Sequence, residues 1–250
     1  MWYGNQNGLS VDSFLLSWII VLRLEFTAMT PAPVVTIVPA AAEWDAVLEY
    51  YGVKQVHLRP YEYFARNIEA KQATAQAIFL HSGCGKVPAA AATQYAIDTW
   101  HPSLVINIGT CGGLDSALKV GDLILAERTV IYDICERSGG QEEMIERFTT
   151  DLPDCTAMPA CVKRGTLVTG DQDADPARIQ CLRLQYGAIA ADWESGAVAY
   201  VACKCNGIQC RILRVVSDMV TSGDIGNNQV FAERIEQYLP VLLEKLPDFM

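Results

Sequence analysis

Short runs of β-branched and aliphatic residues alternate with longer runs of helical spacing from residue 34 onward. The short runs predict strands, and the longer runs, in which apolar residues recur three or four positions apart, predict helices. The predicted strands are residues 34–38, 77–80, 104–108, 122–126, 165–168, 189–192 and 209–216. The predicted helices are residues 43–51, 87–99, 177–186, 195–206 and 229–246, and the stretch around Ser138, Gly139 and Gly140 predicts a loop.

This order of elements predicts an α/β fold. Strands that alternate with helices form a mainly parallel or mixed sheet, and helices on both faces of the sheet give three layers, α/β/α. No internal repeat or domain-scale linker interrupts the pattern, so we expect a single domain over residues 29–250. In such sheets, ligands bind at the carboxyl ends of the strands.

The first 28 residues stand apart from this pattern, and we expect them to form an appendage that is helical if ordered. They contain the apolar run FLLSWIIVL at residues 14–22, about half the length that spans a bilayer. No Lys or Arg precedes this run, unlike a secretory signal. Met29 is a candidate native start. We expect no membrane partner, and contact of the apolar run with a membrane is the less favoured alternative.

Acidic residues interrupt two otherwise apolar stretches. Asp192 and Glu194 lie in AADWESGAVA at residues 190–199, and Asp218 follows an apolar run in RVVSDMV at residues 214–220. Burying a carboxylate is costly unless it is paired or used. These acids therefore predict a functional site, although each alone is also compatible with a helix cap or a surface charge.

A glycine-rich stretch, VINIGTCGG at residues 105–113, predicts a turn after the central strand. Backbone amides in such a turn can approach a ligand closely, because Gly lacks a Cβ. Thr110 and Cys111 lie in this stretch, Glu43 follows the first predicted strand and Ser217 follows the last. We therefore expect Thr110 and Ser217 among the substrate-binding residues. The stretch matches neither GxGxxG nor the GxxxxGK[ST] phosphate loop.

Composition narrows the functional classes. Hydrophobic residues make up 51% of the chain and charged residues 19%, which is typical of a globular protein. The net charge of −10, without any basic run, argues against a nucleic-acid partner. The nine cysteines form no CxxC pair, which favours reduced thiols and a cytoplasmic location. The three isolated histidines lack metal-ligand spacing, so we expect neither a metal nor another cofactor.

Four motifs occur in the order in which one known family carries them. They are SGCGKVPAA at residues 82–90, IGTCGG at 108–113, DWESGAVAYVA at 192–202 and RVVSD at 214–218. Together they resemble the purine nucleoside phosphorylase/uridine phosphorylase superfamily, and most closely the 5'-methylthioadenosine/S-adenosylhomocysteine nucleosidases. The resemblance implies a nucleoside phosphorylase-like fold and a homodimer. It also implies hydrolysis of the N-glycosidic bond of a purine nucleoside, with release of adenine, in methionine salvage.

The resemblance implies roles for three acids. Asp218 matches the acid that protonates purine N7, so that the base leaves neutral, and Glu43 matches the residue that activates water. Glu194 matches the residue that hydrogen-bonds the ribose hydroxyls. The alternatives are structural: a first-turn helix acid for Glu43, a helix or turn cap for Asp218 and a surface-facing helix acid for Glu194.

Further substrate-binding residues follow from the same likeness. Cys111 and Gly112 resemble residues whose backbone contacts the base and the ribose. Trp193 replaces a methionine that lies along the nucleoside in relatives; its indole is able to stack on sugar or base, or simply to join the core. Arg214 is expected to form a structural ion pair with an acid such as Asp192.

The residues that would hold phosphate distinguish hydrolysis from phosphorolysis. Phosphate-using relatives carry arginines after the first strand and before the glycine-rich stretch, because a dianion needs forked donors. Here residues 39–45 read PAAAEWD and residues 82–89 read SGCGKVPA, without arginine, and Lys86 matches a lysine of the nucleosidases. The alternatives are a phosphorylase with an atypical phosphate site and a nucleoside-binding or storage protein without catalysis.

One position departs from the family pattern. Residues 169–171 resemble the family's TGD turn, but Asp173 stands about where nucleosidases place an aromatic side chain that stacks on adenine. Asp173 is therefore a candidate specificity residue, and the base and the 5' substituent of the substrate stay open. The same segment predicts a helix-entry turn, with Asp175 as N-cap and Pro176 in the first helical position.

Overall fold

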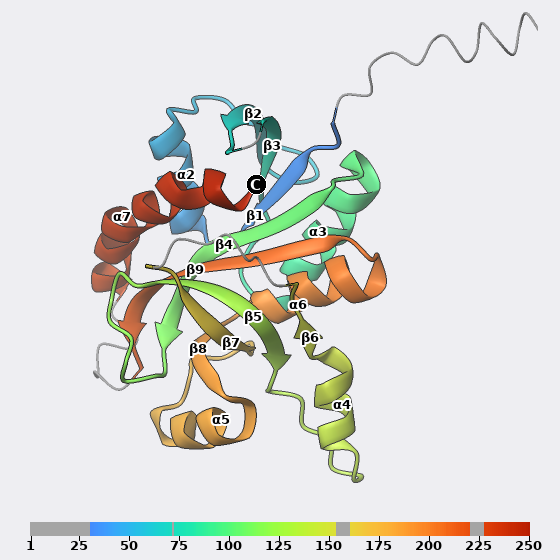
Figure 1. Cartoon of the computed structure of the whole chain (residues 1–250), viewed down its shortest axis with the longest axis vertical. Coiled ribbons are helices and arrows are strands. Elements are labelled where there is room, and N and C mark those ends of the chain that lie inside the picture. The colour runs from blue at the N-terminus through green and yellow to red at the C-terminus, as the bar shows by residue number, and fades with distance from the viewer. Residues whose placement is uncertain (1–30, 72, 154–160, 221–227) are drawn as a thin grey trace, which may run out of the picture. The chain divides into compact units, whose positions relative to one another are not determined.

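The computed structural model describes residues 31–71, 73–153, 161–220 and 228–250 (Figure 1). The chain divides into two units, Met1–Pro31 and Ala32–Met250, and the fold below is that of the second unit. The expected appendage and its apolar run at residues 14–22 lie outside the described residues. Within the described residues, no helix combines the length and the apolarity needed to cross a bilayer.

One mixed sheet organises the described part of the chain. Its strands are β1 (Val34–Val38), β2 (Tyr63–Glu69), β3 (Thr74–His81), β4 (Leu104–Gly113), β5 (Leu123–Ile131), β6 (Thr150–Asp151), β7 (Lys163–Thr169), β8 (Ala188–Asp192) and β9 (Gln209–Met219). Five of the pairings between these strands are parallel and four are antiparallel.

The sheet closes on itself at one end. Its order is β2-β3-β1-β4-β8-β7-β5-β6, and β9 pairs with both β4 and β5, so the pairings of β4, β8, β7, β5 and β9 form a ring. β4 runs parallel to β9 along its whole length, but it meets β8 only at Gly112 and Gly113, which pair antiparallel with Ala191 and Ala190. This short pairing brings the carboxyl ends of β4 and β8 together.

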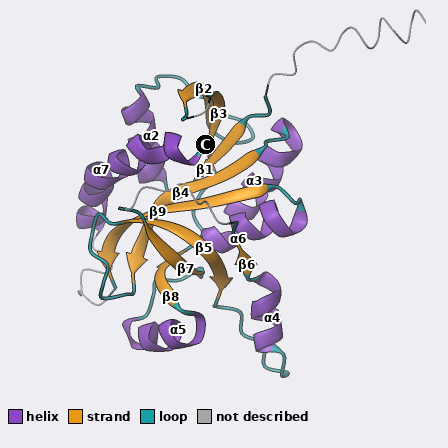
Figure 2. Cartoon of the chain, viewed as in Figure 1, coloured by secondary structure: helices purple, strands orange, loops and turns teal. Residues whose placement is uncertain are grey.

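Helices follow most of the strands (Figure 2). They are α2 (Ala41–Tyr51), α3 (Lys86–Trp100), α4 (Gln141–Phe148), α5 (Ile179–Tyr186), α6 (Ser195–Ala199) and α7 (Asn228–Lys245). A π-helical segment, Tyr200–Cys205, continues α6, and 3-10 turns lie at Pro176–Arg178 and Leu246–Phe249. Gly52 ends α2 with a left-handed φ of 63°, which a residue without a Cβ adopts readily.

Successive residues of β1 point to two different helical layers. Val35 and Ile37 pack in a core with α3 and α6, whereas Val34 and Val38 pack in a second core with α2 and α7. Figure 1 shows α2 beside α7, and α3 beside α6, on opposite sides of the sheet. The predicted three-layer α/β/α fold with a mixed sheet is therefore confirmed.

The main correction to the sequence prediction concerns residues 105–113. The glycine-rich stretch was expected to form a turn, but β4 continues through Gly113, and its register with β9 shifts between Cys111 and Gly112. A Cβ on Gly112 would lie 3.0 Å from Val220 Cγ2 and 3.5 Å from Asp218 Oδ2. Glycine therefore allows β4 to pass close to the end of β9 without leaving the sheet.

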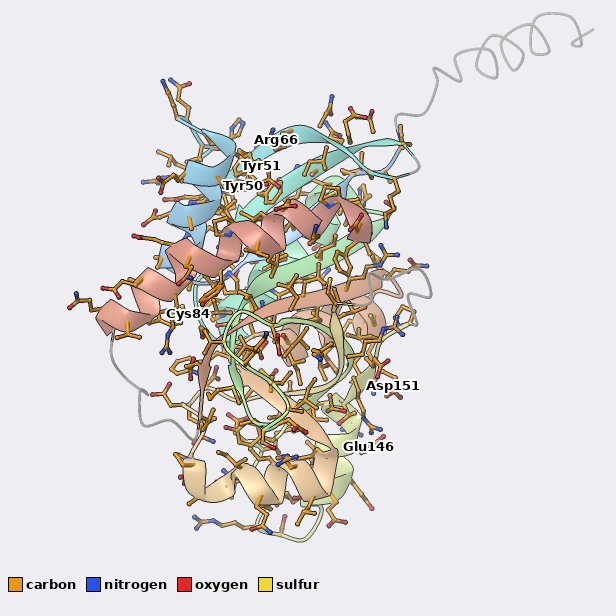
Figure 3. All side chains as sticks on the ribbon, turned by 60° about the vertical axis from the view of Figure 1, so that its left-hand side comes forward. Tyr50, Tyr51, Arg66, Cys84, Glu146 and Asp151 are labelled. Carbon is orange, nitrogen blue, oxygen red and sulfur yellow. The ribbon has the colours of Figure 1, made fainter. Side chains whose placement is uncertain are left out.

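Smaller differences involve polar elements. Ser138, Gly139 and Gly140 lie outside the helices and strands, as predicted, but α4, in which Ile145 is the one buried residue, begins directly after them. The π-helical segment interrupts the helix expected at residues 195–206. The strands β2 and β6 were absent from the prediction. β2 buries only Phe64 and Ile68, while its Arg66 lies over the ring of Tyr51 at 4.1 Å (Figure 3).

Candidate active site

A cavity of about 460 Å³ lies where β4, β8 and β9 end. All nine residues predicted as catalytic or substrate-binding line it: Glu43, Thr110, Cys111, Gly112, Asp173, Trp193, Glu194, Ser217 and Asp218. They come from the first turn of α2, the end of β4, the segment after β7, the connection from β8 to α6 and the end of β9. The fold thus brings together segments that are far apart in the sequence.

Glu43 reaches the cavity from the first turn of α2 and is 3% exposed. Its Oε2 accepts a hydrogen bond from the Ala40 N–H at 3.1 Å. Its Oε1 accepts from the Thr110 N–H at 2.7 Å and from the Thr110 hydroxyl at 2.8 Å. Three donors therefore fix this carboxylate, so that Glu43 both caps α2 and joins the helix to β4.

An ion pair lies beneath the cavity. Arg214 of β9 is 1% exposed, and its Nε donates to Asp192 Oδ2 at 2.7 Å, as the sequence predicted. Asp192 also accepts hydrogen bonds from the hydroxyls of Thr169 and Ser195. Burial acts to lower the pKa of Arg214, but the carboxylates of Asp192 and Glu194 hold it above its usual value. The guanidinium therefore remains charged within the core.

Glu194 precedes α6 and is 8% exposed, so it is not a surface-facing helix acid. The Gly85 N–H donates to its Oε1 at 2.8 Å, and Arg214 Nη2 lies 3.9 Å from its Oε2. Burial, with the nearby charge of Asp192, raises the pKa of Glu194 to about 8 despite Arg214. Glu194 is therefore largely protonated at neutral pH.

Gly109 allows Glu43 and Arg214 to approach the same point of β4. A Cβ on Gly109 would lie 2.9 Å from both carboxylate oxygens of Glu43 and 2.8 Å from Arg214 Nη1. Nη1 is buried and has no hydrogen-bond partner within the described structure. The sequence assigned Arg214 a structural role only, and this second, unpaired donor beside Glu43 was missed.

Asp218 lies half-buried at the end of β9, beside Ser217. The Ser217 hydroxyl lies 2.7 Å from Asp218 Oδ1 and 3.2 Å from the Cys111 carbonyl oxygen. Burial raises the pKa of the Cys111 thiol well above its usual value, so the thiol stays neutral. The Ser217 hydroxyl, which lies between the Cys111 carbonyl oxygen and Asp218 Oδ1, orients the Asp218 carboxyl group.

The outer part of the cavity is formed by more exposed residues. Trp193 is 39% exposed and lines the cavity, so it is not a core residue. Asp173 is exposed and also lines the cavity. The predicted helix-entry turn is confirmed as well: the Asp175 side chain accepts from the Ala177 N–H at 2.9 Å, and Pro176 begins the 3-10 turn.

Sequence reasoning missed one wall of the cavity. Val230, Phe231 and Arg234 of α7 line it, together with Cys84, which is labelled in Figure 3, and Gln172. The three α7 residues share one helix face, because Arg234 follows Phe231 by three positions and Val230 by four. That spacing was visible in the sequence, but only the packing of α7 against α2 and β9 places this face at the cavity.

Protein carboxylates already occupy the N-terminus of α3, a position where anions often bind. The Lys86 N–H donates to Asp171 Oδ1 at 2.8 Å, and the Gly85 N–H donates to Glu194. The Lys86 ammonium forms an ion pair with Asp133 and lies 3.6 Å from Asp171 Oδ2. These donors are thus engaged by acids of the chain itself.

A family model, the phosphorylase superfamily, matches residues 61–245. The chain belongs to this superfamily. One member, the 5'-methylthioadenosine/S-adenosylhomocysteine nucleosidase of Marinomonas sp. (strain MWYL1), is 27% identical to the chain over 230 residues, which covers 84% of the chain and 94% of the relative. The resemblance inferred from the four motifs is confirmed.

Solved structures of the superfamily share the fold. A mutant of the Helicobacter pylori nucleosidase MTAN, with 5'-methylthioadenosine in the active site, aligns with a TM-score of 0.73 and 21% identity, covering 88% of this chain and 100% of that chain. The futalosine hydrolase of Helicobacter pylori strain 26695 aligns with a TM-score of 0.71 and 22% identity, covering 88% of this chain and 99% of the other.

Proposed function

We propose that this protein is a nucleosidase that hydrolyses the N-glycosidic bond of a purine nucleoside and releases adenine. The leading substrates are 5'-methylthioadenosine and S-adenosylhomocysteine. One observation carries the proposal: Glu43, Glu194 and Asp218, from three distant parts of the chain, line a single cavity. The curated relative from Marinomonas, which aligns over most of the chain, supports the substrate class.

Departure of the base requires a proton, because a purine anion is a poor leaving group. Asp218 supplies this proton to N7 as a general acid. The Ser217 hydroxyl, 2.7 Å from Oδ1, fixes the rotation of the carboxyl group. A carboxylic acid at this position neutralises the base as the bond to the sugar breaks.

The sugar becomes cationic as the base leaves, and the acidic cavity stabilises that charge. Glu194 accepts hydrogen bonds from the ribose hydroxyls. These donors and the developing cation both favour the ionised form of Glu194, whose pKa in the ligand-free protein is about 8. Glu194 therefore releases its proton to solvent as the substrate binds, and it faces the developing cation as a carboxylate.

Water attacks the anomeric carbon with Glu43 as the general base. Arg214 Nη1 and the Glu43 oxygens all lie within 3 Å of the position of a Gly109 Cβ. A water oxygen in this region accepts a hydrogen bond from Arg214 while it donates its proton toward Glu43. Arg214 thus has a positioning role in addition to its ion pair with Asp192.

Hydrolysis rather than phosphorolysis follows from the charges around the anomeric carbon. A phosphate dianion would meet the carboxylate of Glu43, while the Lys86 ammonium is engaged by Asp133 and Asp171. Like charges at close range disfavour such binding. The three acids Glu43, Glu194 and Asp218 are held in place by hydrogen bonds, which supports catalysis rather than nucleoside storage.

The test is a panel of nucleosides assayed with and without phosphate. It includes adenosine, 5'-methylthioadenosine, S-adenosylhomocysteine and futalosine, and both products are identified by chromatography and mass spectrometry. We expect free adenine and the free sugar at a rate independent of phosphate. Formation of a sugar 1-phosphate at a phosphate-dependent rate would establish a phosphorylase, and tight binding without turnover would establish a binding protein.

We also infer that the enzyme acts as a homodimer in the cytoplasm, in methionine salvage. The family resemblance supports all three inferences. Light scattering on the purified protein measures its oligomeric state directly.

A further inference from the structure

A segment after β7, residues 171–174, forms part of the cavity wall without belonging to a helix or a strand. We call it the wall segment; the residues by which it lines the cavity are Gln172, Asp173 and Ala174. Just before it, the Gly170 N–H donates to the Asp192 carbonyl oxygen at 3.1 Å. Within the described residues, no backbone–backbone hydrogen bond involves residues 171–174. The position of this part of the wall therefore depends on side chains.

Asp171 joins the wall segment to the N-terminus of α3. Its Oδ1 accepts a hydrogen bond from the Lys86 N–H at 2.8 Å. A Cβ on Gly85 would lie 3.0 Å from the same oxygen, so glycine at this position allows the close approach. The Gly85 N–H donates to Glu194 Oε1 at 2.8 Å. Two successive amides of the chain therefore hold the wall segment and the acid proposed to bind the ribose.

The Lys86 side chain forms a cluster of charges with Asp133 and Asp171. Its ammonium pairs with Asp133 Oδ1 and lies 3.6 Å from Asp171 Oδ2. Asp133 Oδ2 accepts a hydrogen bond from the Asp171 N–H at 2.9 Å. The side chains of Lys86 and Asp133 are 20% and 14% exposed, so water screens their attraction less than that of a surface pair. The cluster joins the segments after β5 and β7 to the start of α3.

The proposed reaction assigns no step to Lys86. The described residues that line the cavity do not include it. The two acids proposed for catalysis are held by other groups. Glu43 accepts hydrogen bonds from Thr110, and Asp218 Oδ1 lies 2.7 Å from the Ser217 hydroxyl. Loss of the Lys86 ammonium therefore leaves these contacts of both catalytic acids in place.

We propose that Lys86 is a positioning residue that holds the wall segment where it fits the bound nucleoside, and so sets the affinity for substrate without acting on the reacting atoms. The proposal rests on the proposed function, in which this cavity binds the nucleoside. Without the ammonium, the carboxylates of Asp133 and Asp171 would repel each other across the space that it occupies. The wall segment would then move away from α3, and its contacts with the nucleoside would weaken.

Lys86→Met tests the proposal, because it removes the ammonium and keeps a side chain of similar length. We expect KM for 5'-methylthioadenosine to rise about 10-fold, the low end of the range for a hydrogen bond to a charged group, with kcat changed less than about twofold. Asp133→Asn should raise KM similarly. The double variant should be no worse than the poorer single variant, because both changes break one cluster. Lys163→Met, at the exposed start of β7, is the matched control and should keep the wild-type KM.

Two further measurements separate this proposal from the proposed function. Amide hydrogen exchange at residues 171–174 of the ligand-free protein should be about 10-fold faster in Lys86→Met than in the wild type, with exchange in β7 unchanged. Dissociation constants in Asp218→Asn, with and without Lys86→Met, should repeat the KM ratio in the absence of turnover.

Unchanged exchange at residues 171–174, a fall in kcat at constant KM, or additive effects in the double variant would overturn the proposal. The same measurements on Asp133→Asn decide the question if Lys86→Met does not fold. If the wild type turns over no nucleoside, the proposed function fails, while hydrogen exchange still decides whether Lys86 positions the wall segment.

Discussion

Among single residues, Glu194 links the site most directly to protein stability. Its pKa of about 8 exceeds the value of about 4.3 for an unfolded Glu. Between these values the folded protein keeps a proton that the unfolded chain has released. The resulting stabilisation is complete below the unfolded pKa and is lost as the pH rises through the folded pKa.

We therefore expect the free energy of unfolding to fall with rising pH, by up to about 1.4 kcal/mol per pH unit between about pH 5 and pH 8, relative to Glu194→Gln. The variant cannot titrate at this position and keeps a neutral side chain of similar shape. Urea unfolding of both proteins across this range measures the two slopes. Parallel slopes would show that Glu194 is ionised in the folded protein.

The role of Asp218 is tested by removing its proton without changing its shape. Asp218→Asn should lower kcat by about 100- to 10,000-fold, the range of general acid catalysis, with nucleoside binding and the fold retained. Stopped assays of adenine release and calorimetric binding measure the two effects. Asp98→Asn, on the exposed face of α3, is the control and should match the wild type. An active, folded Asp218→Asn protein would exclude Asp218 as the acid.

Gly109 is expected to be as important as the charged residues around it. In Gly109→Ala the new Cβ would lie within 3 Å of both Glu43 oxygens and Arg214 Nη1, so these groups must separate. We expect at least about a 100-fold loss of kcat/KM, because misplacement by an ångström has such an effect, and about 1–3 kcal/mol of destabilisation. Gly140→Ala, where no atom lies within 4 Å, should behave as wild type. A fully active Gly109→Ala enzyme would show that catalysis does not need the close approach of Glu43 and Arg214.

At the scale of elements, the sequence predicted those with strong apolar periodicity. The buried strand β1 was predicted with its observed bounds, because all five of its residues are buried and apolar or β-branched. The strand β2 was missed because only two of its seven residues are buried, and α4 because Ile145 is its one buried residue. Weakly buried elements carry little hydrophobic signal, whatever their backbone conformation.

The turn after β7 combines two roles that the sequence presented as alternatives. Asp175 caps the 3-10 turn that leads into α5, while Asp173, two residues earlier, lines the cavity. Asp173→Phe should restore an aromatic surface and raise kcat/KM for 5'-methylthioadenosine about threefold to tenfold, since aromatic stacking contributes about 0.5–1.5 kcal/mol. Steady-state kinetics on 5'-methylthioadenosine and adenosine measure this gain. Unchanged kinetics on both would place the side chain away from the bound substrate.

At the scale of the whole molecule, the cavity depends on how the sheet closes. The sequence predicted that Glu43, Glu194 and Asp218 converge, because each follows a strand and the family motifs occur in order. It did not predict the pairing of Gly112 and Gly113 with β8, which brings the ends of β4 and β8 together. It also did not predict the α7 wall. Both depend on contacts between distant segments, which local periodicity does not encode.

The same architecture indicates which part of the chain is needed for activity. The first strand of the sheet begins at Val34, between β3 and β4, and every described residue that lines the cavity follows it. A chain that begins at Met29 should therefore fold with the same melting temperature and the same kcat/KM as the full chain. Circular dichroism and adenine release measure the two quantities.

A chain that begins at residue 39 is the matched control, because it lacks β1 but keeps every predicted site residue. Without β1, β3 and β4 lose their shared partner and both helical layers lose Val34–Val38, so this chain should not fold. Aggregation or inactivity of the chain from Met29 would instead show that the first 28 residues stabilise the catalytic unit or its subunit contact.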